Sequence, residues 1–150
     1  MAAFAVVSTN HTSFTVSDLD RTISFFRDAL GFRLLNRSHR DPGFTERVVG
    51  VPGAAIEVAY VEAPGHRVEL IQYHAPEGRK RYTPRPCDVG FAHIAFDVDD
   101  LDAALAAAAG HGVMPLGAPV VVPAGPNKGT RAVYTRDSDG VTIELIEKRR

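Results

Sequence analysis

The amino-acid sequence predicts an α+β fold built from two tandem copies of one βαβββ module. Both halves of the chain contain a histidine followed at the same offset by Asp-Leu-Asp, and both close on a segment that contains Glu-Leu-Ile. Within each half the apolar pattern changes from the two-residue period of a strand to the period of about 3.6 residues that marks a helix. Matches that recur in the same order indicate a duplicated structural unit.

The repeat begins at His11 in the first half and at His93 in the second. Asp-Leu-Asp follows at 18–20 and again at 100–102, with a phenylalanine and a valine at matching positions in between. The closing segments read Val-Glu-Leu-Ile and Ile-Glu-Leu-Ile, and a tyrosine precedes each of them. One such match could arise by chance, but the whole ordered set favours duplication.

The elements of the first module follow from local signals. A strand is expected at about 10–16, where residues alternate in character. Ser17 or Asp18 then caps a helix whose apolar residues recur at helical spacing until Gly31 stops it. Further strands are predicted at 33–37, 45–51, 56–61 and 67–73.

The second module repeats this order. A short helical stripe through Leu101 and Leu105 ends at Gly110 or Gly112. Strands are predicted at 114–116, 120–123, 131–135 and 142–147. The predicted organisation is a single domain over 1–150, with module one at about 8–74, a proline-containing linker at about 75–89 and module two at about 90–148.

Four polar residues occupy the strand faces that the apolar core leaves free, because side chains alternate along a strand. They are His11, Glu69, His93 and Glu144. One explanation is that this face is simply hydrated. The other is a metal site, since imidazole nitrogen and carboxylate oxygen suit Zn, Ni, Co, Mn or Fe(II), and two carboxylates balance the charge of a divalent ion.

Composition excludes several other classes of function. The formal net charge of -1 provides no basic field for a nucleic-acid partner. No apolar run approaches the roughly 20 residues that span a bilayer, and the first residues lack the features of a secretory signal, so we expect a cytoplasmic protein with no membrane partner. Cys87 is the only cysteine, which excludes an internal disulfide and a thiolate cluster.

With these motifs the chain resembles the vicinal oxygen chelate superfamily, which includes glyoxalase I, methylmalonyl-CoA epimerase, extradiol dioxygenases, fosfomycin-resistance enzymes and bleomycin-binding proteins. The resemblance runs from His11 to Glu147. Besides the two histidine segments, it rests on Phe25–Phe32 (FFRDALGF) and on Arg136–Gly140 (RDSDG) before the second closing strand. It implies that paired βαβββ units form an open, cup-shaped mixed sheet around a metal site.

The resemblance also implies a chemistry. In glyoxalase I two histidines and two glutamates bind one divalent metal ion, which corresponds here to His11, Glu69, His93 and Glu144. The implied reaction is a glyoxalase-like or epimerase-like lyase or isomerase step, in which a proton leaves the carbon α to a metal-bound carbonyl of a small substrate. Glu144, or by symmetry Glu69, is the expected base.

Two positions depart from the family pattern. Glyoxalase I commonly has an arginine for the glutathione carboxylate at the position of Thr15, and the epimerases usually have glutamine at the position of Glu69. Tyr60 and Tyr134 are further candidates as hydrogen-bond donors in the cleft, although tyrosines in strands are also common for packing.

Two alternatives stay open at this stage. One is an antibiotic- or natural-product-binding resistance protein with the same cup, and the other is an Fe(II) ring-cleaving dioxygenase that uses His11, His93 and Glu144. A homodimer is expected, because an open sheet leaves strand edges that need cover. Whether the site forms within one chain or across the dimer is open.

Overall fold

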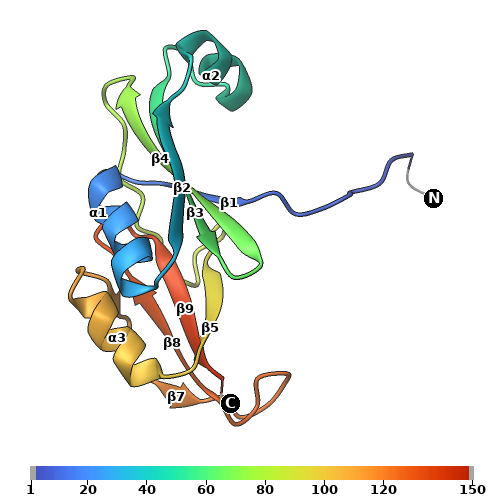
Figure 1. The fold of residues 1–150 in the computed structure, drawn as a ribbon, viewed down its shortest axis with the longest axis vertical. Coiled ribbons are helices and arrows are strands. Elements are labelled where there is room, and N and C mark those ends of the chain that lie inside the picture. The colour runs from blue at the N-terminus through green and yellow to red at the C-terminus, as the bar shows by residue number, and fades with distance from the viewer. Residues whose placement is uncertain (1–2, 149–150) are drawn as a thin grey trace.

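The computed structural model describes residues 3–148 and shows an elongated molecule with two mixed sheets arranged along its long axis (Figure 1). The predicted α+β class is confirmed. The chain forms two separate mixed sheets, one from each module, and not one continuous sheet. The predicted domain, 1–150, extends two residues beyond the described range at each end. The elements are β1 (Thr12–Thr15), α1 (Leu19–Ser24), η1 (Phe25–Ala29), β2 (Arg33–His39), α2 (Pro42–Val49), β3 (Ala55–Ala63), β4 (His66–Ala75), β5 (Ile94–Val98), α3 (Leu101–Ala109), β6 (Met114–Pro115), β7 (Val120–Val121), β8 (Arg131–Arg136) and β9 (Thr142–Glu147).

The two sheets repeat one connectivity. The strand order is β1-β4-β3-β2 in the first sheet and β5-β9-β8-β6 in the second, where β7 also pairs with β8. The first strand of each module runs parallel to the last, and the other pairs are antiparallel. The register is repeated as well, since Ser13 lies opposite Glu69 and Ala95 lies opposite Glu144. Each glutamate is therefore on the strand beside its module's histidine.

The helices α1 and α3 lie along one side of the molecule (Figure 1). Each begins at an aspartate, Asp18 or Asp100, whose side chain accepts the backbone amide three residues later, so the predicted cap of α1 is confirmed as Asp18. After Ser24 the first helix widens into the π-helical turn η1, which ends before Gly31. No helix within residues 3–148 is long and apolar enough to cross a bilayer.

One hydrophobic core joins both modules. Leu70 and Leu145 occupy equivalent positions on the closing strands and are fully buried in it. Phe32 of the first module meets Phe96 of the second edge-on, with ring centroids 5.1 Å apart. The predicted alternation is thus confirmed: the apolar faces of both sheets turn toward the helices, and the opposite faces are left free for the site.

The predicted strand at 45–51 is wrong, because Pro42–Val49 form the helix α2. Asp41 caps this helix by accepting a backbone amide at 2.7 Å, and the first-turn Pro42 needs no amide partner. Gly50 ends it in the left-handed conformation, with φ 68°. The β-branched residues between these signals suggested a strand, but the flanking cap and stop decide the local structure. The other predicted strands are observed with ends shifted by a few residues.

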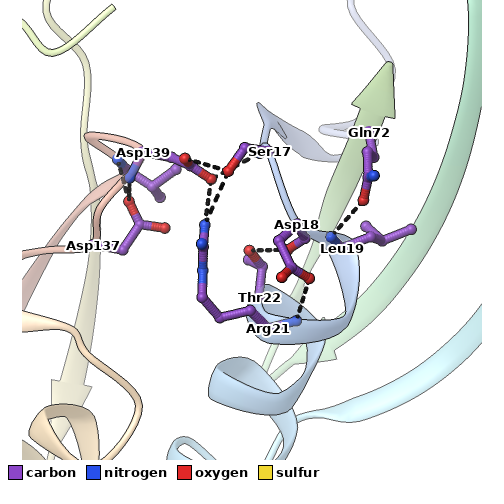
Figure 2. Close-up of polar contacts among 9 residues, drawn as sticks. Ser17, Asp18, Leu19, Arg21, Thr22, Gln72, Asp137 and Asp139 are labelled. Atoms are coloured by element: carbon purple, nitrogen blue, oxygen red, sulfur yellow. Dashed lines mark hydrogen bonds and ion pairs between the residues drawn. The ribbon is translucent and has the colours of Figure 1, made fainter. Parts of the chain in front are cut away.

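A polar network centred on Asp139 joins the β8–β9 turn to the start of α1 (Figure 2). Asp139 accepts the backbone amide of Ser17 at 2.8 Å, its hydroxyl at 2.6 Å and the Arg21 guanidinium at 2.6 Å. Burial alone would raise the pKa of Asp139, but the Ser17 hydrogen bonds and the charge of Arg21 hold that pKa below its usual value. The network therefore fixes the second sheet against the first helix.

Candidate metal centre

The first histidine–glutamate pair lies on the face of the first sheet that the helices do not cover. His11 immediately precedes β1, and its Nε2 is 3.2 Å from Oε2 of Glu69 on β4. The ring Nδ1 lies 2.6 Å from Oδ1 of Asn10, an acceptor, so Nδ1 carries the donated proton. The other ring nitrogen, Nε2, faces the Glu69 carboxylate. The two facing atoms, an imidazole nitrogen and a carboxylate oxygen, are donor types that divalent metal ions bind.

Tyr60 supports the glutamate of this pair. It lies opposite Glu69 in the β3–β4 register and donates a hydrogen bond to Glu69 Oε1 at 2.5 Å. Burial, with the hydrogen bond to Glu69, raises the pKa of Tyr60 to about 12. The Tyr60 ring also meets the His11 ring edge-on at 5.5 Å. One carboxylate oxygen is thus held by the tyrosine, and the other faces the imidazole.

The second pair repeats the geometry on the second sheet. His93 Nε2 is 3.1 Å from Oε2 of Glu144. Tyr134 is the counterpart of Tyr60 and lies opposite Glu144 in the register, but its hydroxyl is 3.3 Å from His93 Nε2 instead. Burial, followed by the charge of Glu144, raises the pKa of Tyr134. Phe91 stacks on the His93 ring with centroids 6.0 Å apart, whereas the residue directly before His93, at the position of Asn10, is Ala92.

The chain therefore presents two half-sites: half-site one is His11 with Glu69, and half-site two is His93 with Glu144. In residues 3–148, no cluster of three or more histidine, cysteine, aspartate or glutamate side chains is placed to hold a metal ion. All four predicted ligands are brought into pairs, but the pairs belong to different sheets. Two donors are too few for a structural or catalytic metal, which takes at least three protein ligands.

A cavity adjoins half-site two. Its volume is about 450 Å³, and Tyr134 and Glu144 line it beside an apolar wall formed mainly by residues 116–123. A larger cavity of about 650 Å³ lies under the linker at 77–82 and contains none of the four predicted ligands. Of these two cavities, only the one of about 450 Å³ is lined by a predicted ligand, Glu144, so it is the candidate place for a substrate.

Comparison with known proteins decides the family. The model of the Glyoxalase/Bleomycin resistance protein/Dioxygenase superfamily matches residues 8–145. The chain belongs to this superfamily. The match includes both half-sites and the segment between them, so the family predicted from the sequence motifs is confirmed.

Named relatives narrow the comparison. The chain is 34% identical over 145 residues to a 2-epi-5-epi-valiolone epimerase from Actinomyces sp., covering 93% of this chain and 79% of that protein. It is 33% identical over 147 residues to a lactoylglutathione lyase from Haemophilus influenzae, covering 93% and 91%. A solved glyoxalase family protein from Bacillus cereus superposes with a TM-score of 0.84 at 27% identity, over 100% of this chain and 99% of that one. The relatives thus include enzymes that act on small molecules.

Sequence reasoning identified Tyr60 and Tyr134 beside the predicted ligands but missed the other neighbouring groups. Asn10 and Phe91 each lie beside a site histidine, and Arg136 packs over the Phe91 ring at 5.7 Å. Asn10 directly precedes His11, and an amide next to a candidate ligand is a signal that could have been noticed. Phe91 gives no comparable signal, since only its packing onto His93 gives it a place in the site.

Proposed function

We propose that this protein is a divalent-metal-dependent epimerase, or a related isomerase or lyase, which removes a proton from the carbon next to a substrate carbonyl. The observation that carries the proposal is the pair of equivalent half-sites, each with an imidazole nitrogen within 3.2 Å of a carboxylate oxygen. Relatives that match 93% of the chain are named as an epimerase and as lactoylglutathione lyases, which supports a reaction of this class.

In this proposal the metal centre forms between two copies of the chain. Half-site one of one copy faces half-site two of the other, so that a symmetric dimer contains two equivalent centres. The division of the ligands between two sheets supports this arrangement. So does their position, because β1 and β5 beside the histidines are edge strands whose outer sides have no partner strand in the described chain.

The combined donor set of two imidazoles and two carboxylates fits Zn, Ni, Co, Mn or Fe(II). When bound, such an ion would supply Lewis-acid stabilisation of the negative charge that develops on the carbonyl oxygen. Glu144 is the proposed base, and Glu69 and the two histidines are the proposed lasting ligands. Glu144 is more exposed than Glu69, 23% against 13%, and it lines the 450 Å³ cavity. In the proposal Glu144 takes the α-proton as the carbon's electron pair moves toward the carbonyl. A water molecule then donates a proton to the opposite face of the carbon, which inverts it, and the hydroxide left behind is neutralised by the proton that Glu144 releases.

An epimerase is favoured over a glutathione-dependent lyase by Thr15, which has no charge to offer the glutathione carboxylate at the position where glyoxalase I commonly has arginine. The identities do not separate the two classes, because the chain is 34% identical to the valiolone epimerase and 33% identical to the lactoylglutathione lyase. The proposed substrate is therefore a small molecule without a glutathione group, with a hydroxyl-bearing carbon beside a carbonyl.

A subunit-mixing experiment tests the metal centre. The double variants His11→Ala/Glu69→Ala and His93→Ala/Glu144→Ala each lose one half-site, and neither should bind metal alone. After the two are unfolded together, refolded and loaded with Zn²⁺ or Ni²⁺, heterodimers should regain one intact centre. Random pairing gives about one quarter of the wild-type metal content. Elemental analysis of protein with a tag that contains no histidine measures it.

The outcomes separate the possible arrangements. Wild type with stoichiometric metal, and a mixture with none, would place the centre within one chain. Wild type without stoichiometric metal would overturn the metal-dependent enzyme and favour a binding protein. Activity is tested by NMR in D₂O with 2-epi-5-epi-valiolone and with the hemithioacetal of methylglyoxal and glutathione. Deuterium should enter the α-carbon of the first substrate, and turnover of the second alone would show a lyase.

A further inference from the structure

The two modules hold their glutamates differently, although the ligand positions are equivalent. Tyr60 and Tyr134 both lie opposite the site glutamate in the strand register. Only the Tyr60 hydroxyl reaches its glutamate, at 2.5 Å from Oε1 of Glu69. The Tyr134 hydroxyl lies 3.3 Å from Nε2 of His93. Duplication therefore preserved the ligands but changed what their neighbours do.

The Tyr60 contact leaves the metal-facing atoms of half-site one free. Glu69 gives Oε1 to the tyrosine and turns Oε2 toward His11 Nε2, and these last two atoms are the ones a metal ion would take. A hydroxyl bonded to a carboxylate is a charge-assisted contact, among the stronger hydrogen bonds in proteins. Asn10 holds the far nitrogen of the same histidine. In half-site one, Tyr60 and Asn10 therefore bind the atoms of Glu69 and His11 that point away from the proposed metal position. The two atoms that face each other, Oε2 and Nε2, remain as the proposed metal ligands.

The Tyr134 contact has the opposite relation to the metal. Its hydroxyl approaches Nε2 of His93, the nitrogen that already faces Glu144 and that a metal ion would need. This contact must break when a metal binds, so it cannot hold the ligand in its loaded position. No tyrosine hydroxyl in residues 3–148 fixes the Glu144 carboxylate in the way that Tyr60 fixes Glu69.

We propose that Tyr60 is a positioning residue, which keeps Glu69 oriented as a permanent ligand and so restricts carboxylate exchange to Glu144. The inference rests on the proposed function and extends it, because it assigns different roles to two glutamates that symmetry makes equivalent. Half-site one is the fixed part of the centre. Half-site two is the part from which a carboxylate leaves to work as a base.

Metal affinity tests the assignment without any substrate. The dissociation constant for Zn²⁺ is measured by competition with a chromophoric chelator for wild type, Tyr60→Phe and Tyr134→Phe. Loss of an outer hydrogen bond to a ligand weakens metal binding by about 10- to 100-fold, which is the result expected for Tyr60→Phe. Tyr134→Phe is the matched control, and its affinity should stay the same or rise, because the removed hydroxyl competes with the metal for His93.

A spectroscopic measurement distinguishes positioning from general loosening. The Co²⁺-loaded Tyr60→Phe protein should show an altered visible absorption, whereas the thermal midpoint of the metal-free protein should fall no further than in Tyr134→Phe. Equal affinities for Tyr60→Phe and wild type would overturn the positioning role and leave the metal centre standing. Equal losses in both variants would also overturn it. Wild type without stoichiometric metal would remove the metal centre and the positioning role together.

Discussion

The two modules have the same strand connectivity and equivalent candidate ligands, but the structure around those ligands differs. The first sheet has long central strands, Ala55–Ala63 and His66–Ala75, and it carries the additional helix α2. The second sheet has two edge strands of only two residues each, β6 and β7, and an apolar cavity beside its glutamate. The first half-site is held by Asn10 and Tyr60, and the second is bordered by aromatic rings.

This difference shows where a duplicated fold can diverge. The register that sets each glutamate beside its histidine's strand is the same in both sheets, since it follows from backbone pairing. The neighbours of the ligands are single side chains, which can change without disturbing that pairing. One half-site can therefore specialise in holding a metal while the other specialises in exchange and substrate contact.

The largest expected effect separates the two glutamates. Glu144→Gln should lower α-proton exchange by about 10²- to 10⁴-fold, the range supplied by a general base, while metal binding falls less. Glu69→Ala should instead act through lost metal content, because it removes the carboxylate oxygen that faces His11 in half-site one. Deuterium incorporation and metal analysis on the same samples give both values. If the two variants prove indistinguishable, the division of roles is wrong.

We expect equivalent core residues of the two modules to contribute equally to the free energy of unfolding, although the two half-sites differ. Leu70→Ala and Leu145→Ala remove equivalent, fully buried side chains, and each should lower the free energy of unfolding by about 2–5 kcal/mol. Urea denaturation of metal-free protein measures both. Costs that differ by more than about 2 kcal/mol would show that the modules differ in packing as well as in their sites.

A smaller effect is expected at the junction of the modules. Asp139→Asn removes a charge that is 6% exposed, and the free energy of unfolding at pH 7 should fall by about 2–3 kcal/mol, as for hydrogen bonds to charged groups. Asp102→Asn is the control, since its ion pair with Arg131 involves a carboxylate that is 71% exposed, and such pairs contribute about 0–1 kcal/mol.

The pH dependence of this variant has a definite sign. The folded-state pKa of Asp139 is lowered, so its contribution is present above the unfolded-state pKa of about 3.9 and is lost as the pH falls further. The gap between wild type and Asp139→Asn should therefore close below about pH 4. Denaturation curves at neutral and acidic pH test this, and a gap that widens in acid would contradict the role given to Asp139.

Most of the fold could be predicted from the sequence, because the signals that set each strand and helix lie within short segments that recur in both modules. Alternation placed Leu70 and Leu145 in the core and the glutamates on the free face, and burial agrees. The strand prediction failed at 45–51, because the β-branched residues were given more weight than the helix start at Asp41–Pro42 and the helix stop at Gly50. The combination of half-sites that would bind one metal ion could not be predicted either. Which half-sites meet depends on how two sheets pack around one core, and strand periodicity carries no information about that.

The contact between the linker and the β8–β9 turn limits where the chain can accept an insertion. Gly140 has φ 87°, and a Cβ there would lie 3.1 Å from the carbonyl oxygen of Tyr82 and 3.3 Å from Cα of Thr83. The linker backbone is thus seated on the β8–β9 turn at 82–83 and is no free tether. An affinity tag or a fluorescent label belongs before Tyr82, within 77–81, where the inserted sequence can loop outward. The same insertion at 82–83 would lift the linker from the turn that carries Asp139.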